Sequence, residues 1–182
     1  GLTNWTEQNN NGFDLFWVTF IDENTGFAAG ETGAFKITTD GGATWTDHNN
    51  TSTYPTAKGI HFFYSNNGLL AGIIGKVYNT TDAGVTWTQI TTPITNDLLD
   101  MNFVNDTLGY ISAKAGKVLK TIDGGENWEE LTTGETEDLL SVEFTSVDVG
   151  YAMGAAGTAL YTTDGGATWI EVPDEDFTGN YF

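Results

Sequence analysis

The sequence repeats one short turn motif four times at a nearly constant distance. The motif has the pattern T-x-D-x-G-x-x-W and begins at Thr38, Thr80, Thr121 and Thr162. Successive motif aspartates are 42, 41 and 41 residues apart. A fixed period of about 20–50 residues marks a repeat architecture. The chain is therefore expected to fold as a row of similar units.

Each period predicts four short strands separated by Gly, Asn and Asp turns. We expect first strands at 16–20, 59–62, 99–103 and 140–144, glycine-led second strands at 26–30, 68–72, 109–113 and 150–154, third strands that run into each motif, as at 34–38, and fourth strands at 45–47, 87–90, 128–131 and 169–172. Four antiparallel strands in about 40–45 residues are typical of a β-propeller blade. A β-sandwich would not explain the fixed period, and helical apolar spacing does not persist.

The four repeats span about 9–50, 51–92, 93–133 and 134–174, with partial repeats at both ends. Residues 4–7 look like the end of a motif, and residues 176–182 look like a first strand. We therefore expect a single all-β propeller domain, partial or small, cut from or continuing into a larger ring. The alternative is a complete ring of four or five blades closed by its terminal strands, with the N-terminal strand as the clasp.

The motif is expected to stabilise the fold. Its aspartate can accept hydrogen bonds from its own turn, its glycine can supply a positive φ, and its tryptophan can be buried in the blade. Four near-identical copies favour a structural role, because one active site needs one copy. The predicted structural set is Asp40, Gly42, Trp45, Asp82, Gly84, Trp87, Asp123, Gly125, Trp128, Asp164, Gly166 and Trp169.

Composition excludes several functions. The 182 residues include 25 acidic and 6 basic residues, giving a net charge of −19. Such a charge disfavours nucleic acids and anionic membrane surfaces. All six basic residues are lysines, and there is no cysteine, so disulfides and thiolate sites are excluded. No apolar run approaches the roughly 20 residues of a membrane span.

The motif and its surroundings resemble a known family. The T-x-D-x-G-x-x-W turn is similar to the Asp-box, or bacterial neuraminidase repeat. The wider pattern, with segments such as G-Y-A-M-G at 150–154, resembles the photosystem II stability and assembly factors and their secreted bacterial relatives. This resemblance covers essentially the whole chain and implies a propeller fold. It implies function only weakly, since propellers host many activities.

The resemblance offers three functional readings. Sialidases bind a carboxylate with an arginine triad, which this chain lacks, so that activity is excluded. Xyloglucanases need paired carboxylates across a cleft between two propellers, so the chain would be a fragment without the catalytic parts. The assembly factors are scaffolds with an arginine-rich patch, which is also missing here. The resemblance therefore implies only the generic function of the family for this chain, which is that of a rigid disc that binds another macromolecule.

Candidate binding residues are those that break the repeat. First strands line the central channel of propellers, so their non-repeating side chains are expected there: Trp17, His61, Asp100, Asn102 and Glu143. Trp17 could anchor a sugar or peptide, or simply pack between blades. Tyr54 lies in the longest loop, 47–55, which is a second candidate surface or a plain linker. The two histidines, His48 and His61, form no ligand pair, so no metal or cofactor is predicted.

These observations predict a non-catalytic binding or scaffold module of a secreted or cell-surface bacterial protein, with the periplasm as another location. Its partner would be a protein or glycan, without nucleic acid or direct membrane insertion. Self-association or further blades would complete the ring. The alternatives are a fragment of an Asp-box glycoside hydrolase and a photosystem-type assembly scaffold.

Overall fold

The computed structural model describes residues 12–48 and 56–172 and is built almost entirely from β-strands. Four sheets of four antiparallel strands follow one another along the chain. Blade 1 holds β1 (Leu15–Phe20), β2 (Gly26–Gly30), β3 (Phe35–Thr38) and β4 (Thr46–Asp47); blade 2 holds β5 (Ala57–Phe62), β6 (Gly68–Gly72), β7 (Val77–Thr80) and β8 (Thr88–Ile90); blade 3 holds β9 (Leu98–Phe103), β10 (Gly109–Ala113), β11 (Val118–Thr121) and β12 (Glu129–Leu131); blade 4 holds β13 (Leu139–Phe144), β14 (Gly150–Gly154), β15 (Ala159–Thr162) and β16 (Ile170–Glu171).

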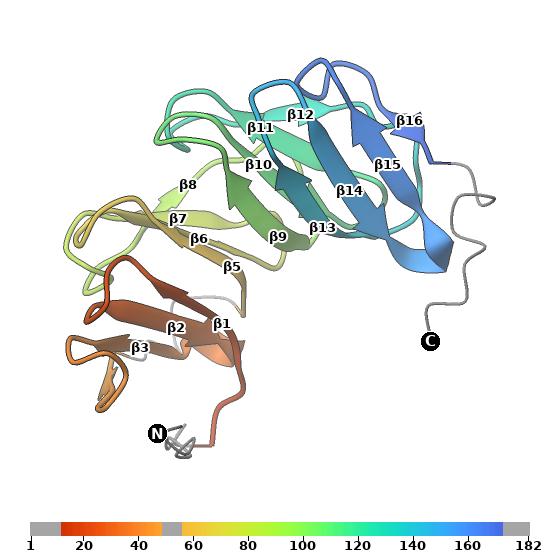
Figure 1. Ribbon diagram of the computed structural model, residues 1–182. Coiled ribbons are helices and arrows are strands. Elements are labelled where there is room, and N and C mark those ends of the chain that lie inside the picture. Colours follow the sequence, from red (N-terminus) through yellow and green to blue (C-terminus); the bar gives the residue numbers. More distant parts are fainter. Residues whose placement is uncertain (1–11, 49–55, 173–182) are drawn as a thin grey trace, which may run out of the picture.

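The blades form an open arc (Figure 1). The inner strands β1, β5, β9 and β13 lie on its concave side, and each is the first strand of its sheet. This arrangement confirms the predicted all-β propeller fold with a turn motif between the third and fourth strands. The described blades do not close on themselves, so the alternative of a closed four-bladed ring is not what the structure shows. The predicted N-terminal clasp lies outside the described residues.

The turn motif folds through its own side chains, and the second copy shows how. Asp82 Oδ1 accepts hydrogen bonds from Thr80 Oγ1 and from the Thr86 backbone N–H, both at 2.8 Å. Asp82 Oδ2 accepts a third from Thr86 Oγ1 at 2.6 Å. The Gly84 N–H donates to Thr80 Oγ1 at 2.9 Å, and Gly84 has a φ of +83°. All four motif aspartates accept equivalent bonds, so these carboxylates are used inside their own turns.

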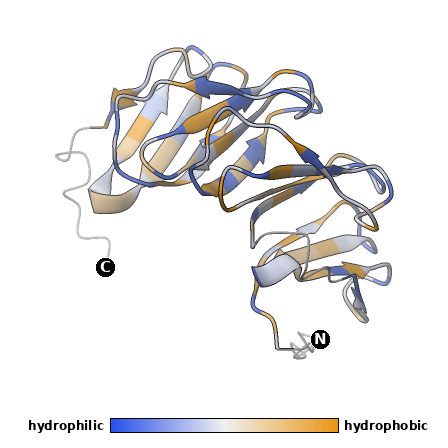
Figure 2. Cartoon of the chain, turned by 180° about the vertical axis from the view of Figure 1, so that it is seen from behind, coloured by the Kyte–Doolittle hydropathy of each residue, from blue (hydrophilic) through white to orange (hydrophobic). Residues whose placement is uncertain are grey.

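The hydrophobic core lies between blades. Each blade has a back face toward the preceding blade and a front face toward the following one. Three apolar clusters join blade 1 to blade 2, blade 2 to blade 3 and blade 3 to blade 4. Apolar segments accordingly recur in the strands along the whole arc (Figure 2). Burial between blades, rather than within one sheet, therefore stabilises the fold.

The motif tryptophan belongs to the back face, so its burial depends on the preceding blade. Trp87 is 9% exposed and lies edge-on to Phe35 of blade 1, with ring centroids 5.4 Å apart. Trp128 is similarly buried at 8% exposure. Trp45 and Trp169 are both half-buried; Trp45 meets the ring of Phe20 within its own blade, and Trp169 packs against the apolar cluster between blades 3 and 4. The four tryptophans are thus not equally buried, although their motifs are nearly identical.

Candidate binding surface on the inner strands

Every inner strand carries one unpaired residue in its first half. The register between the first and second strands shifts at the same place in all four blades, which marks a β-bulge. We call the residues at these bulges the inner row: Phe16, Lys58, Leu99 and Leu140. Bulges re-aim side chains without interrupting the rest of the sheet. Each blade therefore has one bulged position on its inner strand, and the residue at this position varies among the blades.

Two members of the inner row are exposed, and two members from neighbouring blades contact each other. Phe16 is 45% exposed and Leu140 is 56% exposed. The Lys58 ammonium nitrogen lies 4.4 Å from the centroid of the Phe16 ring, a cation–π contact between neighbouring blades. Sequence reasoning missed this row because it considered the residues one and three positions further along. Its signal was the variation at that position, but without the bulge there was no reason to single it out.

Three of the predicted binding residues lie together where blade 3 meets blade 4, and they connect the two blades. Asp100 Oδ2 accepts hydrogen bonds from Ser141 Oγ at 2.8 Å and from the Val142 N–H at 3.0 Å. Asn102 Oδ1 accepts one from the Phe144 N–H at 3.0 Å. The Asn102 amide also donates to Glu143 Oε2 at 2.8 Å. Asp100 and Asn102 accept hydrogen bonds from backbone N–H groups of the neighbouring inner strand. Both side chains therefore connect blade 3 to blade 4.

His61 lies at the junction of blades 2 and 3 inside a group of aromatic rings. Its ring stacks on Phe103 and meets Phe63 edge-on, with centroids 4.7 Å apart in both cases. Burial lowers the pKa of His61 to about 4, although the charge of Asp106 opposes this shift. The imidazole is therefore neutral at neutral pH and is not poised to act as a general acid. The His61 ring can contribute aromatic surface to a binding site, but it is not set up for proton transfer.

The remaining predicted residues do not join this cluster. Trp17 is half-buried and packs against the apolar cluster between blades 1 and 2. Tyr54 lies outside the described residues. Within 12–48 and 56–172, no group of three or more His, Cys, Asp or Glu side chains could hold a metal ion. The helical segments of the same ranges are single 3-10 turns, so no helix there could cross a membrane.

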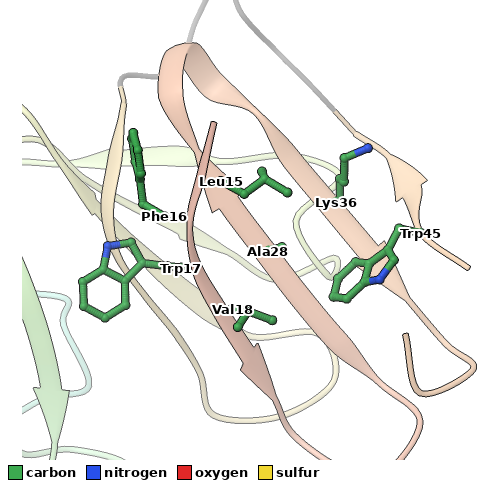
Figure 3. Close-up of a pocket in the computed structure, with 7 residues that line it drawn as sticks. All are labelled: Leu15, Phe16, Trp17, Val18, Ala28, Lys36 and Trp45. Carbon is green, nitrogen blue, oxygen red and sulfur yellow. The ribbon is translucent and has the colours of Figure 1, made fainter. Parts of the chain in front are cut away.

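A second accessible surface is the back face of blade 1. A cavity of about 320 Å³ adjoins this face, and the residues around it are Leu15, Phe16, Trp17, Val18, Ala28, Lys36 and Trp45; in Figure 3 the Trp17 ring points away from Val18 and Trp45. Val18 is 61% exposed, and Phe20 beside it is 46% exposed. Lys36 is buried and forms an ion pair with Asp47. This face is apolar because it corresponds to faces that are covered in the other three blades.

A family model matches more than half of the chain, over residues 79–178. Its description is Photosynthesis system II assembly factor YCF48. The chain belongs to this family. The assignment confirms the resemblance seen in the turn motif and the wider repeat. No curated protein matches the sequence.

Solved structures support the same fold. A YCF48 structure, "YCF48 bound to D1 peptide", matches with a TM-score of 0.71 and 20% identity, over 87% of this chain and 53% of that one. YCF48 from Cyanidioschyzon merolae matches with a TM-score of 0.68 and 15% identity, over 92% and 62% respectively. An ancestral GH74 enzyme matches with a TM-score of 0.75 and 16% identity, over 96% and 26%. The chain therefore spans only part of the length of these propeller proteins, and at such identities the likeness concerns the fold.

Proposed function

We propose that this chain is a non-catalytic binding module that holds a partner protein by an extended, basic and partly apolar segment laid across the inner row. Membership of the assembly-factor family is the observation that carries this proposal. One of the matched structures is YCF48 bound to D1 peptide, so a propeller of this family can take a peptide. For the present chain, the location of the peptide site is inferred from its own residues.

The chemistry of the inner row favours binding over catalysis. Phe16, Leu99 and Leu140 offer apolar contact on three of the four inner strands. A strand-like segment crossing the blades would meet an apolar side chain on blades 1, 3 and 4 and Lys58 on blade 2. Apolar anchors on a rigid scaffold give affinity at low ordering cost.

The charge of the chain sets the chemistry of the partner. A net charge of −19 attracts basic segments and repels acidic ones. Several lysines are already engaged: Lys114 with Asp97, Lys117 with Glu130, and Lys36 with Asp47. The partner segment is therefore expected to carry lysine or arginine between its apolar residues. Its binding should weaken as salt screens the attraction, since the Debye length falls to about 8 Å at physiological ionic strength.

The test is an array of short peptides that vary in charge and hydrophobicity, probed with the labelled chain, with a glycan array in parallel. We expect binding to basic, partly apolar peptides that weakens with added salt. The Leu140→Ser variant should bind less. Val147→Ser is the matched control, because Val147 is a similarly exposed aliphatic residue of the same blade, at 53% against 56%. Equal loss in both variants, or binding to glycans alone, would contradict the proposal.

The expected secreted or cell-surface location stays a prediction, as does a glycan partner. The glycoside-hydrolase alternative has support from the fold of the matched GH74 enzyme. That enzyme is covered only to 26% by this chain, so catalytic parts would have to lie elsewhere. We therefore give the binding role precedence.

A further inference from the structure

Lys58 is the charged member of the inner row. The other three blades place Phe16, Leu99 and Leu140 at the bulge of the inner strand. Lys58 lies on β5 of blade 2, and the inner strands β1 and β9 pack against β5 on either side (Figure 1). The surroundings of this lysine therefore come from three neighbouring blades, and they decide what its ammonium group can bind.

The ammonium group of Lys58 is held in place but is not neutralised. It lies 4.4 Å from the centroid of the Phe16 ring, which is a favourable cation–π contact. Among residues 12–48 and 56–172, no carboxylate oxygen lies within 4.0 Å of this nitrogen, whereas Lys36, Lys114 and Lys117 each have such a partner. Contact with a ring face positions the charge and leaves its N–H groups available to an acceptor.

The carboxylate of Asp97, just before β9, is near Lys58 but is already used. Asp97 Oδ1 accepts a hydrogen bond from the Ile74 N–H at 2.9 Å, and Oδ2 lies 2.9 Å from the Lys114 ammonium nitrogen. The Lys114 contact, followed by the Ile74 hydrogen bond, holds the pKa of Asp97 below its usual value, and the charge of Lys58 adds a smaller contribution. Asp97 is therefore a charged group that is bound to Lys114 and Ile74.

The sequence of blade 2 omits an acid that the other described blades carry beside the inner row. Two residues before the inner-row residue, those blades have Asp14, Asp97 and Asp138, whereas blade 2 has Thr56. Thr56 Oγ1, Asp97 Oδ1 and Asp138 Oδ1 each accept a backbone N–H from the turn between the second and third strands of the preceding blade. Threonine accepts this bond without a negative charge. The blade that presents a lysine is thus the described blade in which this position does not compensate the charge.

We infer that Lys58 is a specificity-determining residue of the peptide surface and binds a carboxylate side chain of the partner segment. This inference rests on the proposed function, because it assigns the chemistry of one position in the segment that lies across the inner row. A carboxylate opposite blade 2 accepts charge-assisted hydrogen bonds from the ammonium group, while apolar residues lie opposite Phe16, Leu99 and Leu140. The segment is therefore basic overall but carries an aspartate or glutamate at a single position.

The charge of the chain makes this position selective. At a net charge of −19, an acidic residue of a partner meets repulsion over most of the chain, so it is favoured only where a lysine compensates it. An acid placed one blade earlier or later would meet Phe16 or Leu99 and would lose its hydrogen bonds. Lys58 thus selects which segments bind and fixes their alignment along the blades.

The test measures the binding of acetylated and amidated peptides of alternating leucine and lysine, in which a single glutamate is moved stepwise along the sequence. Each peptide is compared with its glutamine counterpart by titration calorimetry. We expect one position at which glutamate binds about threefold to tenfold more tightly than glutamine, as for an accessible charged hydrogen bond. Added salt should reduce this difference. Because both ends of the peptides are blocked, a terminal carboxylate cannot replace the side chain.

Two variants of Lys58 and one control locate the effect. Lys58→Gln should abolish the preference for glutamate, and Lys58→Glu should reverse it in favour of lysine at the same position of the peptide. Lys76→Glu is the matched control, because Lys76 is also a half-buried lysine of blade 2 but lies outside the inner row. It changes the net charge as Lys58→Glu does, and the preference should persist. Urea unfolding of each variant checks that its fold is retained.

The outcomes separate this inference from the proposed function. If no peptide of the set binds the wild type, the proposed function fails and the inference fails with it. If peptides bind but no position favours glutamate, only the role of Lys58 is overturned. The same holds if Lys58→Gln keeps the preference or if Lys76→Glu loses it equally, since the effect would then come from net charge.

Discussion

Replacing Trp87 by alanine should destabilise the chain far more than the same change at Trp45. Trp87 is 9% exposed and contacts Phe35 and Phe62 edge-on, so it belongs to the junction of two blades. A buried aromatic side chain removes about 150–250 Å² from water, which corresponds to about 4–6 kcal/mol. Truncation of such a side chain costs about 3–5 kcal/mol in practice. We expect the free energy of unfolding to fall by that amount in Trp87→Ala.

Within the described residues no preceding blade covers Trp45, so Trp45→Ala removes mainly its contact with Phe20. The expected cost of Trp45→Ala is about 1–2 kcal/mol, from one aromatic pair and partial burial. Urea unfolding followed by far-ultraviolet circular dichroism gives the shift in midpoint, and the slope converts it to free energy. Equal losses at the two positions would refute the view that blade junctions determine the stability of each motif.

Two further predictions concern the turns and the buried histidine. Gly84→Ala should lower stability by about 1–3 kcal/mol, because Gly84 has a φ of +83° and its new Cβ would meet the Phe35 ring at 2.2 Å. Gly134→Ala should lower the free energy of unfolding by only about 1 kcal/mol, because Gly134 has a similar φ of +87° but open space around it. Equal urea midpoints for the Gly84→Ala and Gly134→Ala variants would argue against the clash with Phe35. Burial lowers the pKa of folded His61 to about 4, whereas the unfolded value is 6.5, so the unfolded state binds more protons between these values. The free energy of unfolding of the wild type should therefore fall as the pH falls from 6.5 to 4, and that of His61→Phe should fall less. Urea unfolding at a series of pH values measures both. Parallel pH dependences would show that His61 does not titrate in this way.

The fold could be predicted in detail because its signals are local. The second strands begin and end where the glycine-led segments indicated, as in β6 (Gly68–Gly72). The fourth strands are slightly shorter than expected, since each begins after the motif tryptophan. The turn motif itself was predictable because the hydrogen bonds of its own side chains join residues no more than four positions apart. Local chemistry of this kind is fully visible in a sequence.

The binding surface was harder to predict because it depends on how blades meet. Asp100 and Asn102 were singled out as unusual, and the structure directs both toward backbone N–H groups of β13. Partners 42 positions away in the chain cannot be read from a repeat pattern alone. The inner row was missed for a related reason, since a bulge removes one residue from the alternation of inward and outward side chains along the strand. Only the packed arrangement distinguishes side chains that join blades from those that remain accessible.

The turn motif and the two-sided blade together make the repeat a transferable unit. Each copy of about 41 residues brings a self-contained turn, a surface that accepts its predecessor and a surface that receives its successor. Duplication or loss of one copy leaves every remaining contact of the same type. The number of blades in such proteins can therefore change through gene duplication without redesign of the core, while the bulged position in each copy is free to diverge toward a new ligand.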